Sequence, residues 1–256
     1  MTVMVADWAN FSQALPVAVQ FGVGLEFQEF TSPDHLAEPE EWIKTILDGA
    51  KNLPLLSMHG PFAEMIPASQ DPWVRQVASR RFQQAYDIAH KTAARHLILH
   101  SGYIPKTYRR ESWVQNTCNF WIDFLQDKHK PGLIHLENVY EDDFSTLQEL
   151  VDNVNQAMGD ELLTICLDIG HVNANSSHNL EEWISGLGVR IKYVHLHNNG
   201  GVLDDHWRLD KGTIDIPKVV DLLQIHAPDA LWTVETTVED IEPSLLWLQE
   251  KGYLDA

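Results

Sequence analysis

Basic residues, cysteines and long hydrophobic runs are scarce in this chain. There are 18 lysines and arginines against 37 aspartates and glutamates, which gives a formal net charge of −19. Proteins that bind nucleic acids usually do so through clustered lysine and arginine, so this balance disfavours a nucleic-acid partner. The two cysteines, Cys118 and Cys166, lie in a helical pattern and a strand pattern. They are expected to be reduced core residues of a cytoplasmic protein.

No apolar run approaches the roughly 18 residues that a membrane helix needs. The first residues, MTVMVADWAN, contain no basic segment ahead of a hydrophobic one. We therefore expect neither a secretion signal nor a membrane span. With 256 residues, 44% of them hydrophobic, the chain can bury a full core. No low-complexity linker divides the chain, and residues 1–256 are expected to form a single domain.

Short β-branched and aliphatic runs alternate with helical patterns along the whole chain. The eight predicted strands are residues 3–8, 22–30, 53–60, 96–102, 132–138, 163–171, 191–198 and 231–236. Eight strand–helix alternations over this length predict an α/β fold, a (β/α)₈ TIM barrel. A doubly wound open sheet has the same local pattern and is the alternative. Its dinucleotide-binding form loses support, because no GxGxxG follows the first strand.

Three of the predicted helices carry clear signals. In residues 73–90 apolar side chains recur at steps of three and four, at Val74, Val77, Ala78, Ala85, Ile88 and Ala89. Residues 179–188 begin with an asparagine cap and end at a glycine. In residues 240–252 Pro243 is expected in the first helical turn, and Gly252 is expected to end the helix.

Six of the predicted strands end in a residue type that binds metals. These residues are His59, His100, Glu137, Asp168 followed by His171, His195 with His197, and Glu235. One such residue alone is more often a solvated loop residue, but six in succession favour a shared site. In a barrel the carboxyl ends of all strands surround one mouth, where active sites lie. Histidines and carboxylates that converge there predict a divalent-metal site with nitrogen and oxygen ligands.

Other polar residues have weaker claims to a role. His135 lies two residues before Glu137, so it is expected to point into the barrel one layer deeper. Cys166 shares a face with Asp168 and is expected to be core rather than a ligand. Glu26 could face the mouth or be structural. No role is assigned to the histidines placed in loop or helix patterns, which are His35, His90, His96, His129, His178 and His226.

Taken together, the strand-end motifs resemble those of the xylose isomerase-like TIM barrels. This superfamily holds sugar-phosphate isomerases and epimerases and the endonuclease IV type of apurinic-site nuclease. The motifs are HGPF, HSG, LEN, LDIGH, HLHNN, DDHWRLDKGTID and VET, and they lie between residues 59 and 236. Ser101 replaces the proline of His-Pro-Gly, and Asn198 replaces the first aspartate of His-x-x-Asp-Asn. Asp210 and Lys211 also depart from the family pattern.

The resemblance implies a metal-dependent isomerase or epimerase of a ketose, a sugar phosphate or a related polyol. One divalent ion, Mn²⁺ by preference and otherwise Zn²⁺, Mg²⁺ or Co²⁺, would be held by Glu137, Asp168, His195 and Glu235. Glu137 and Glu235 would also be the catalytic acid–base pair, moving a proton through a metal-stabilised enediolate. The substrate would be held by His59, His100, His171, His197, Asp204 and His206. The partner would be a small sugar or sugar phosphate.

The same residues leave three alternatives open. In the nuclease type, the four metal ligands work with His59, His100, His171, Asp204 and His206 to bind three zinc ions and cleave DNA at abasic sites. The second alternative is an inosose-type dehydratase that uses the same metal site. The third is a non-enzymatic binding barrel. Residues 102–111, which include Lys106, Arg109 and Arg110, form the only basic-aromatic cluster near the mouth. The sequence leaves open whether the chain forms a homo-oligomer.

Overall fold

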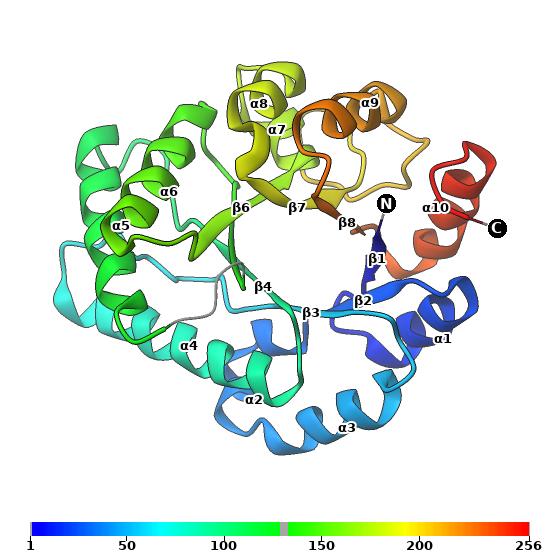
Figure 1. The fold of residues 1–256 in the computed structure, drawn as a ribbon, viewed down its shortest axis with the longest axis horizontal. Helices are drawn as coiled ribbons and strands as arrows, with labels where there is room; N and C mark the ends of the chain where they lie inside the picture. Colours follow the sequence, from blue (N-terminus) through cyan, green and yellow to red (C-terminus); the bar gives the residue numbers. More distant parts are fainter. Residues whose placement is uncertain (1, 129–132, 256) are drawn as a thin grey trace.

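Eight parallel strands form a closed barrel, and they follow the order of the chain around it (Figure 1). This is seen in the computed structural model, which describes residues 2–128 and 133–255. The strands are β1 (Val3–Ala6), β2 (Gly24–Phe27), β3 (Leu56–His59), β4 (His96–His100), β5 (Ile134–Glu137), β6 (Leu163–Asp168), β7 (Ile191–Leu196) and β8 (Leu231–Val234). The pairing of β1 with β8 closes the barrel. The predicted (β/α)₈ fold is therefore confirmed.

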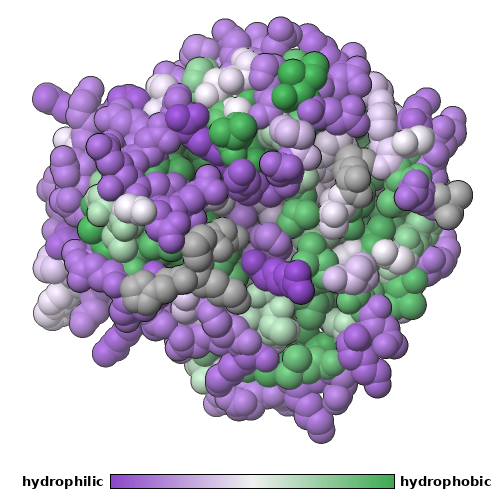
Figure 2. All heavy atoms as spheres, in the orientation of Figure 1, coloured by the Kyte–Doolittle hydropathy of each residue, from purple (hydrophilic) through white to green (hydrophobic). Residues whose placement is uncertain are grey.

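Helices surround the barrel on its outside (Figure 1). They are α1 (Phe11–Phe21), α2 (Pro33–Ala37), α3 (Glu40–Ala50), α4 (Pro72–Lys91), α5 (Arg110–Leu125), α6 (Phe144–Met158), α7 (Ile169–Asn175), α8 (Leu180–Leu187), α9 (Ile216–His226) and α10 (Val238–Glu250). Two short 3₁₀ segments, η1 (Glu29–Thr31) and η2 (Gly188–Arg190), complete the elements. None of the helices in the described ranges is long and apolar enough to cross a membrane. Figure 2 shows mostly hydrophilic side chains around the rim of the molecule.

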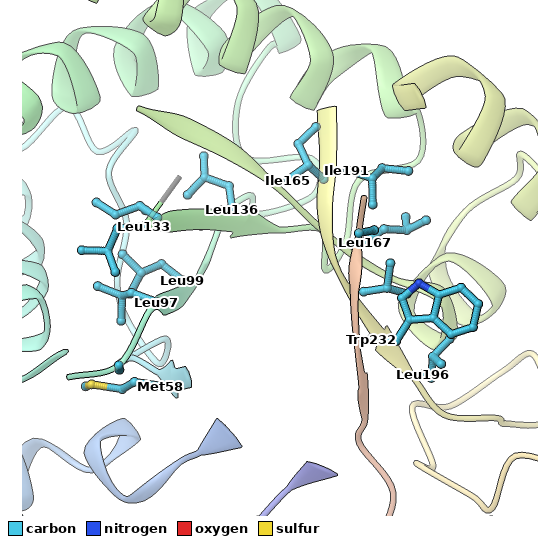
Figure 3. Packing of buried hydrophobic residues seen from close by; sticks show 14 of the residues in the cluster. Met58, Leu97, Leu99, Leu133, Leu136, Ile165, Leu167, Ile191, Leu196 and Trp232 are labelled. Atoms are coloured by element: carbon cyan, nitrogen blue, oxygen red, sulfur yellow. The ribbon is translucent and has the colours of Figure 1, made fainter. Parts of the chain in front are cut away.

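Alternation along each strand sorts the side chains into two environments. Residues such as Leu97, Leu99 and Leu136 face the helices and belong to the large outer core (Figure 3). The residues between them point into the barrel. Met4, Ile98, Cys166 and Tyr193 form a separate, smaller apolar cluster there. Because Ile98, Cys166 and Tyr193 each lie two residues before a metal-ligand residue type, that cluster forms the layer beneath the mouth.

The predicted strands are all present but shorter than expected. The strand predicted at 163–171 ends at Asp168, because Asp168 caps α7 and His171 already lies inside that helix. His197 and Glu235 likewise follow their strands, and Gly132 lies outside the described residues. The predicted helices at 73–90 and 179–188 are confirmed, with a complete capping box at Asn179.

Three expectations about single residues are wrong. His96, grouped with the loop and helix histidines although it begins the predicted strand 96–102, is the first residue of β4, and its Nδ1 lies 2.8 Å from His135 Nε2. Pro243 is in the interior of α10, since that helix already begins at Val238. Val77 belongs to the predicted apolar stripe of α4 but is 51% exposed, because the buried stripe of this helix runs through Ala78, Phe82, Ala85 and Ala89.

Candidate active site

His195 is the centre of the polar cluster at the barrel mouth. Its Nε2 lies 3.1 Å from Glu26 Oε2, and its side chain is fully buried. Its Nδ1 faces three carboxylates, at 3.1 Å from Glu235 Oε2, 3.5 Å from Glu137 Oε1 and 3.7 Å from Asp168 Oδ2. This Nδ1 has no hydrogen-bond partner although it is buried. A buried nitrogen without a partner, surrounded by three carboxylate oxygens, fits a bound cation.

Asp168 connects this centre to the start of α7. Its Oδ1 accepts a hydrogen bond from the backbone N–H of His171 at 2.6 Å, and both its oxygens lie 3.0 Å from His197 Nε2. The side-chain amide of Asn138, which follows β5, donates through its nitrogen to the backbone carbonyl of Asp168 and accepts through its oxygen from the backbone N–H of Asp168. The ring of His197 can approach Asp168 only because residue 170 is a glycine, where an added Cβ would lie 1.9 Å from that ring. Sequence reasoning did not identify Asn138 or Gly170.

The other predicted site residues form two further groups beside this centre. His59 Nε2 lies 3.1 Å from Glu137 Oε2, and His100 Nε2 lies 3.5 Å from the same oxygen. On the other side, Asp204 Oδ2 lies 3.1 Å from His171 Nε2 and 2.8 Å from His206 Nε2. The ligand atoms within each of these two groups lie within 4.8 Å of one another. His197 stacks on His206 at 3.9 Å between ring centroids. The structure thus brings all the predicted site residues together.

Strand β2 and the residue that follows it supply two side chains that sequence reasoning missed or left open. Glu26 Oε2 accepts a hydrogen bond from the Tyr193 hydroxyl at 2.7 Å as well as facing His195. Gln28 Nε2 donates to Glu235 Oε1 at 2.7 Å. The one signal in the sequence was the spacing of Glu26 and Gln28, two polar residues on one face of an otherwise apolar strand.

The barrel interior below these residues is polar as well. The Tyr193 hydroxyl also bonds Ser57 at 2.7 Å and Thr233 at 2.6 Å. His135 Nδ1 lies 2.6 Å from Thr164 Oγ1, so His135 is satisfied by neighbours one layer deeper, as predicted. Cys118 and Cys166 are both free and buried, which confirms their prediction as reduced core residues.

The charges of the cluster favour ionised carboxylates. Burial alone would raise the pKa of Glu137, but His100, His195 and His171 outweigh it and hold this pKa well below its usual value. The pKa of Glu235 is lowered in the same way, mainly by His195 against the effect of burial. Burial lowers the pKa of His100 to about 4, so this imidazole is neutral at pH 7. Burial alone would lower the pKa of His206, but Asp204 and Glu235 outweigh burial and raise this pKa to about 9.

A cavity of about 760 Å³ opens above the cluster. His59, His100, Glu137, His171 and Glu235 lie on its floor, with Asp204 and His206 at one side. The walls come from the loops after β1, β3, β4 and β5 and are largely apolar. Their large side chains are Trp8, Phe62, Met65, Ile66, Tyr103, Ile104, Val139 and Tyr140. No lysine or arginine of the described ranges lines this cavity. In the basic cluster, Arg110 pairs with Glu149 on α6 instead.

Comparisons with known proteins agree with this architecture. A family model described as "Xylose isomerase-like TIM barrel" matches residues 18–255. The uncharacterized protein MJ1311 of Methanocaldococcus jannaschii is 25% identical over 184 residues, which are 70% of this chain and 63% of that protein. The match therefore spans less than two thirds of that relative. A probable endonuclease 4 of Mycobacterium leprae is 24% identical over 233 residues, covering 84% of this chain and 88% of that protein.

A solved structure with a closely similar fold is that of a D-tagatose 3-epimerase-like protein. It superposes with a TM-score of 0.79 at 22% sequence identity, and the match covers 98% of this chain and 96% of that one. At this identity the likeness establishes the fold alone. The family model, in contrast, spans nearly the whole chain, from α1 to the residues after α10. The chain belongs to the xylose isomerase-like TIM barrel family.

Proposed function

We propose that the protein is a divalent-metal-dependent isomerase or epimerase of an uncharged ketose or related polyol. The observation that carries this proposal is the unpartnered Nδ1 of His195 facing Glu137, Asp168 and Glu235. These four side chains would hold the ion. Three carboxylates and one imidazole are a hard donor set that suits Mn²⁺, with Zn²⁺, Mg²⁺ or Co²⁺ as alternatives. The cavity has no lysine or arginine lining among the described residues, which favours an uncharged sugar over a sugar phosphate.

The bound ion would supply positive charge next to a substrate carbonyl and its neighbouring hydroxyl, which makes the hydrogen on the adjacent carbon more acidic. Glu137 ends β5 and Glu235 follows β8, and these two strands lie on opposite sides of β7 in the barrel order. Their lowered pKa values keep both carboxylates ionised and able to accept that proton. One of the two removes the proton, and the other, once it has taken up a proton from water, donates that proton to the opposite face of the same carbon, while the first releases its own proton to water. His171 and Asp204 would hold substrate hydroxyl groups.

Proton transfer can be tested by isotope uptake. Product formed in D₂O should carry deuterium at the reacting carbon. Glu137→Gln and Glu235→Gln should each lower kcat by about 10²–10⁴, because an amide cannot accept the proton. Glu149→Gln is the matched control, since Glu149 pairs with Arg110 on the surface. Turnover of ketoses without deuterium uptake would contradict the proposed roles of the two glutamates and would indicate hydride transfer.

A second candidate function is a multi-metal phosphodiesterase acting at abasic DNA sites. It is favoured by two additional groups of possible ligands, His59–His100–Glu137 and His171–Asp204–His206. Within each group the ligand atoms lie within 4.8 Å of one another. The similarity to a probable endonuclease 4 points the same way. The net charge of −19 and the apolar cavity walls oppose it, because neither attracts a phosphate backbone.

The metal content of the purified protein separates the two functions. About one ion per chain, lost in Asp168→Ala, is expected for the isomerase. About three ions per chain, together with cleavage of a duplex containing an abasic site that a chelator abolishes, would replace our first proposal with the second. An Asp168→Ala variant that keeps its full metal content would contradict the ligand assignment itself.

A further inference from the structure

The cavity above Glu137 and Glu235 is lined by apolar side chains that the proposed reaction does not use. Four large side chains at the mouth remain partly exposed, with Trp8 at 40%, Phe62 at 42%, Ile104 at 36% and Tyr140 at 52%. They come from four different loops and line the same cavity, and we call them the apolar wall. Apolar surface that gathers inside a cavity marks a contact site more often than apolar residues scattered singly over a surface.

The apolar wall begins directly at two of the candidate substrate-binding histidines. The ring of Phe62 stacks on His100 with centroids 4.5 Å apart and an angle of 21°. The indole of Trp8 meets His206 edge-on at 4.7 Å. A molecule that reaches Glu137 and Glu235 therefore passes along these rings. The apolar wall and the polar floor belong to one binding site.

Trp8 is held in the mouth by an unusual backbone. Trp8 has φ of 55° and Ala9 has φ of 53°, a left-handed conformation that is rare for a bulky residue. Asp7 maintains it, because its Oδ1 accepts hydrogen bonds from the backbone N–H groups of Ala9 and Gln28, both at 2.9 Å. Backbone strain of this kind persists where the surrounding structure imposes it, commonly at ligand-binding positions.

Size and charge define what the apolar wall can hold. The cavity of about 760 Å³ lies in the upper part of the range of roughly 300–1,000 Å³ typical of pockets for drug-sized ligands. A single free sugar would fill only part of it. Glu64 and Asp204 of its lining are acidic, the lining histidines His171 and His206 pair with Asp204, and none of the described lining residues is a lysine or arginine. This lining favours an uncharged group beside the apolar wall.

We propose that the apolar wall is a subsite for an aromatic or branched aliphatic substituent carried by the substrate. The substrate is then an uncharged conjugate, whose sugar-like end lies over Glu137 and Glu235 while its apolar end packs on Phe62, Tyr140 and Trp8. The nature of the sugar-like end rests on the function proposed above. The apolar end rests only on the cavity.

Two ethers of one ketose test this subsite. The 6-O-benzyl and 6-O-methyl ethers of D-fructose differ only in the ring that would meet the apolar wall. Calorimetric titration of the Mn²⁺-loaded protein should show about tenfold or tighter binding of the benzyl ether, because burial of an aromatic ring is favourable. Phe62→Ala and Tyr140→Ala should each remove most of this preference. Trp73→Ala should keep it, since Trp73 is 80% exposed and lies outside the cavity.

The outcomes distinguish the subsite from the reaction. Equal binding of the two ethers, or a preference that survives both wall variants, would overturn the subsite. Failure of both ethers to turn over would contradict the proposed isomerase. The difference in their binding would still show whether the apolar wall is a subsite. A preference lost in Trp73→Ala would place the benzyl group elsewhere and would also overturn the proposal.

Discussion

At the scale of single residues, the candidate metal ligands depend on side chains that do not themselves face the centre. Gln28 donates to Glu235 Oε1 at 2.7 Å and lies 3.4 Å from Glu26 Oε1, so it links the partners of His195. Removal of such an outer hydrogen bond typically weakens metal binding by about 10–100-fold. We expect this loss in Gln28→Ala, measured by competition with a chromogenic chelator. The matched control is Gln83→Ala, whose amide pairs with Asp87 on the surface of α4. Unchanged affinity in Gln28→Ala would show that Glu235 is positioned without it.

The histidines also make metal binding depend on pH. Burial alone would lower the pKa of His171 and of His195. Neighbouring carboxylates outweigh burial, among them Asp168 beside His171 and Glu235 beside His195, and they raise both pKa values well above the usual value in the metal-free protein. A protonated His195 has no free electron pair, so binding must release its proton. Affinity should therefore rise with pH, by about tenfold per unit for each proton released. Calorimetry in two buffers of different ionisation enthalpy measures the release. His178→Ala, at a partly exposed loop residue outside the site, should leave the slope unchanged, and a pH-independent affinity would contradict the assignment of His195.

At the scale of secondary-structure elements, the junction of β6 and α7 depends on one glycine. An alanine at Gly170 would usually favour a helix by up to about 1 kcal/mol. Here its Cβ would lie 1.9 Å from the His197 ring, which is fully buried and stacked on His206. Overpacking of this kind costs about 1–3 kcal/mol, so Gly170→Ala should lower the free energy of unfolding in urea and weaken metal binding. In Gly200→Ala the nearest atom is 3.3 Å away on the partly exposed Trp207, and this control should be mild. Equal stability of the two variants would contradict the argument.

The strands and their polar ends could be predicted because both follow local rules. Alternation and β-branched composition mark a strand, and the carboxyl ends of barrel strands share one mouth, so His59, Glu137 and His195 could be grouped from the sequence alone. Glu26 and Gln28 could not be assigned, since a polar residue on a short strand can equally be solvated until the neighbouring strands are placed. The apolar wall was out of reach for a similar reason. Trp8 and Tyr140 lie in loops without periodicity, and only the closed barrel brings them to one cavity.

At the scale of the whole molecule, the fold should not depend on the metal. Most of the buried apolar side chains lie between the strands and the helices, including Trp113, Trp121 and Trp183, far more than the small cluster inside the barrel. We expect the chelated protein to keep its far-UV circular dichroism and to unfold cooperatively. The proposed ion would instead neutralise the facing carboxylates of Glu137, Asp168 and Glu235, which repel one another in a chain whose net charge is −19.

Binding of the ion should then raise the stability by mass action alone. At a free metal concentration of a hundred times Kd, the gain is about 2.7 kcal/mol. For a chain of this size that corresponds to an increase in Tm of about 5–10 °C in a thermal melt. Asp168→Ala should show no such increase at the same metal concentration, because it lacks a ligand of the centre while the core remains. Loss of the circular dichroism signal on chelation would show that the folded state requires the metal. A shift of equal size in Asp168→Ala would place the stabilising ion elsewhere on this acidic molecule.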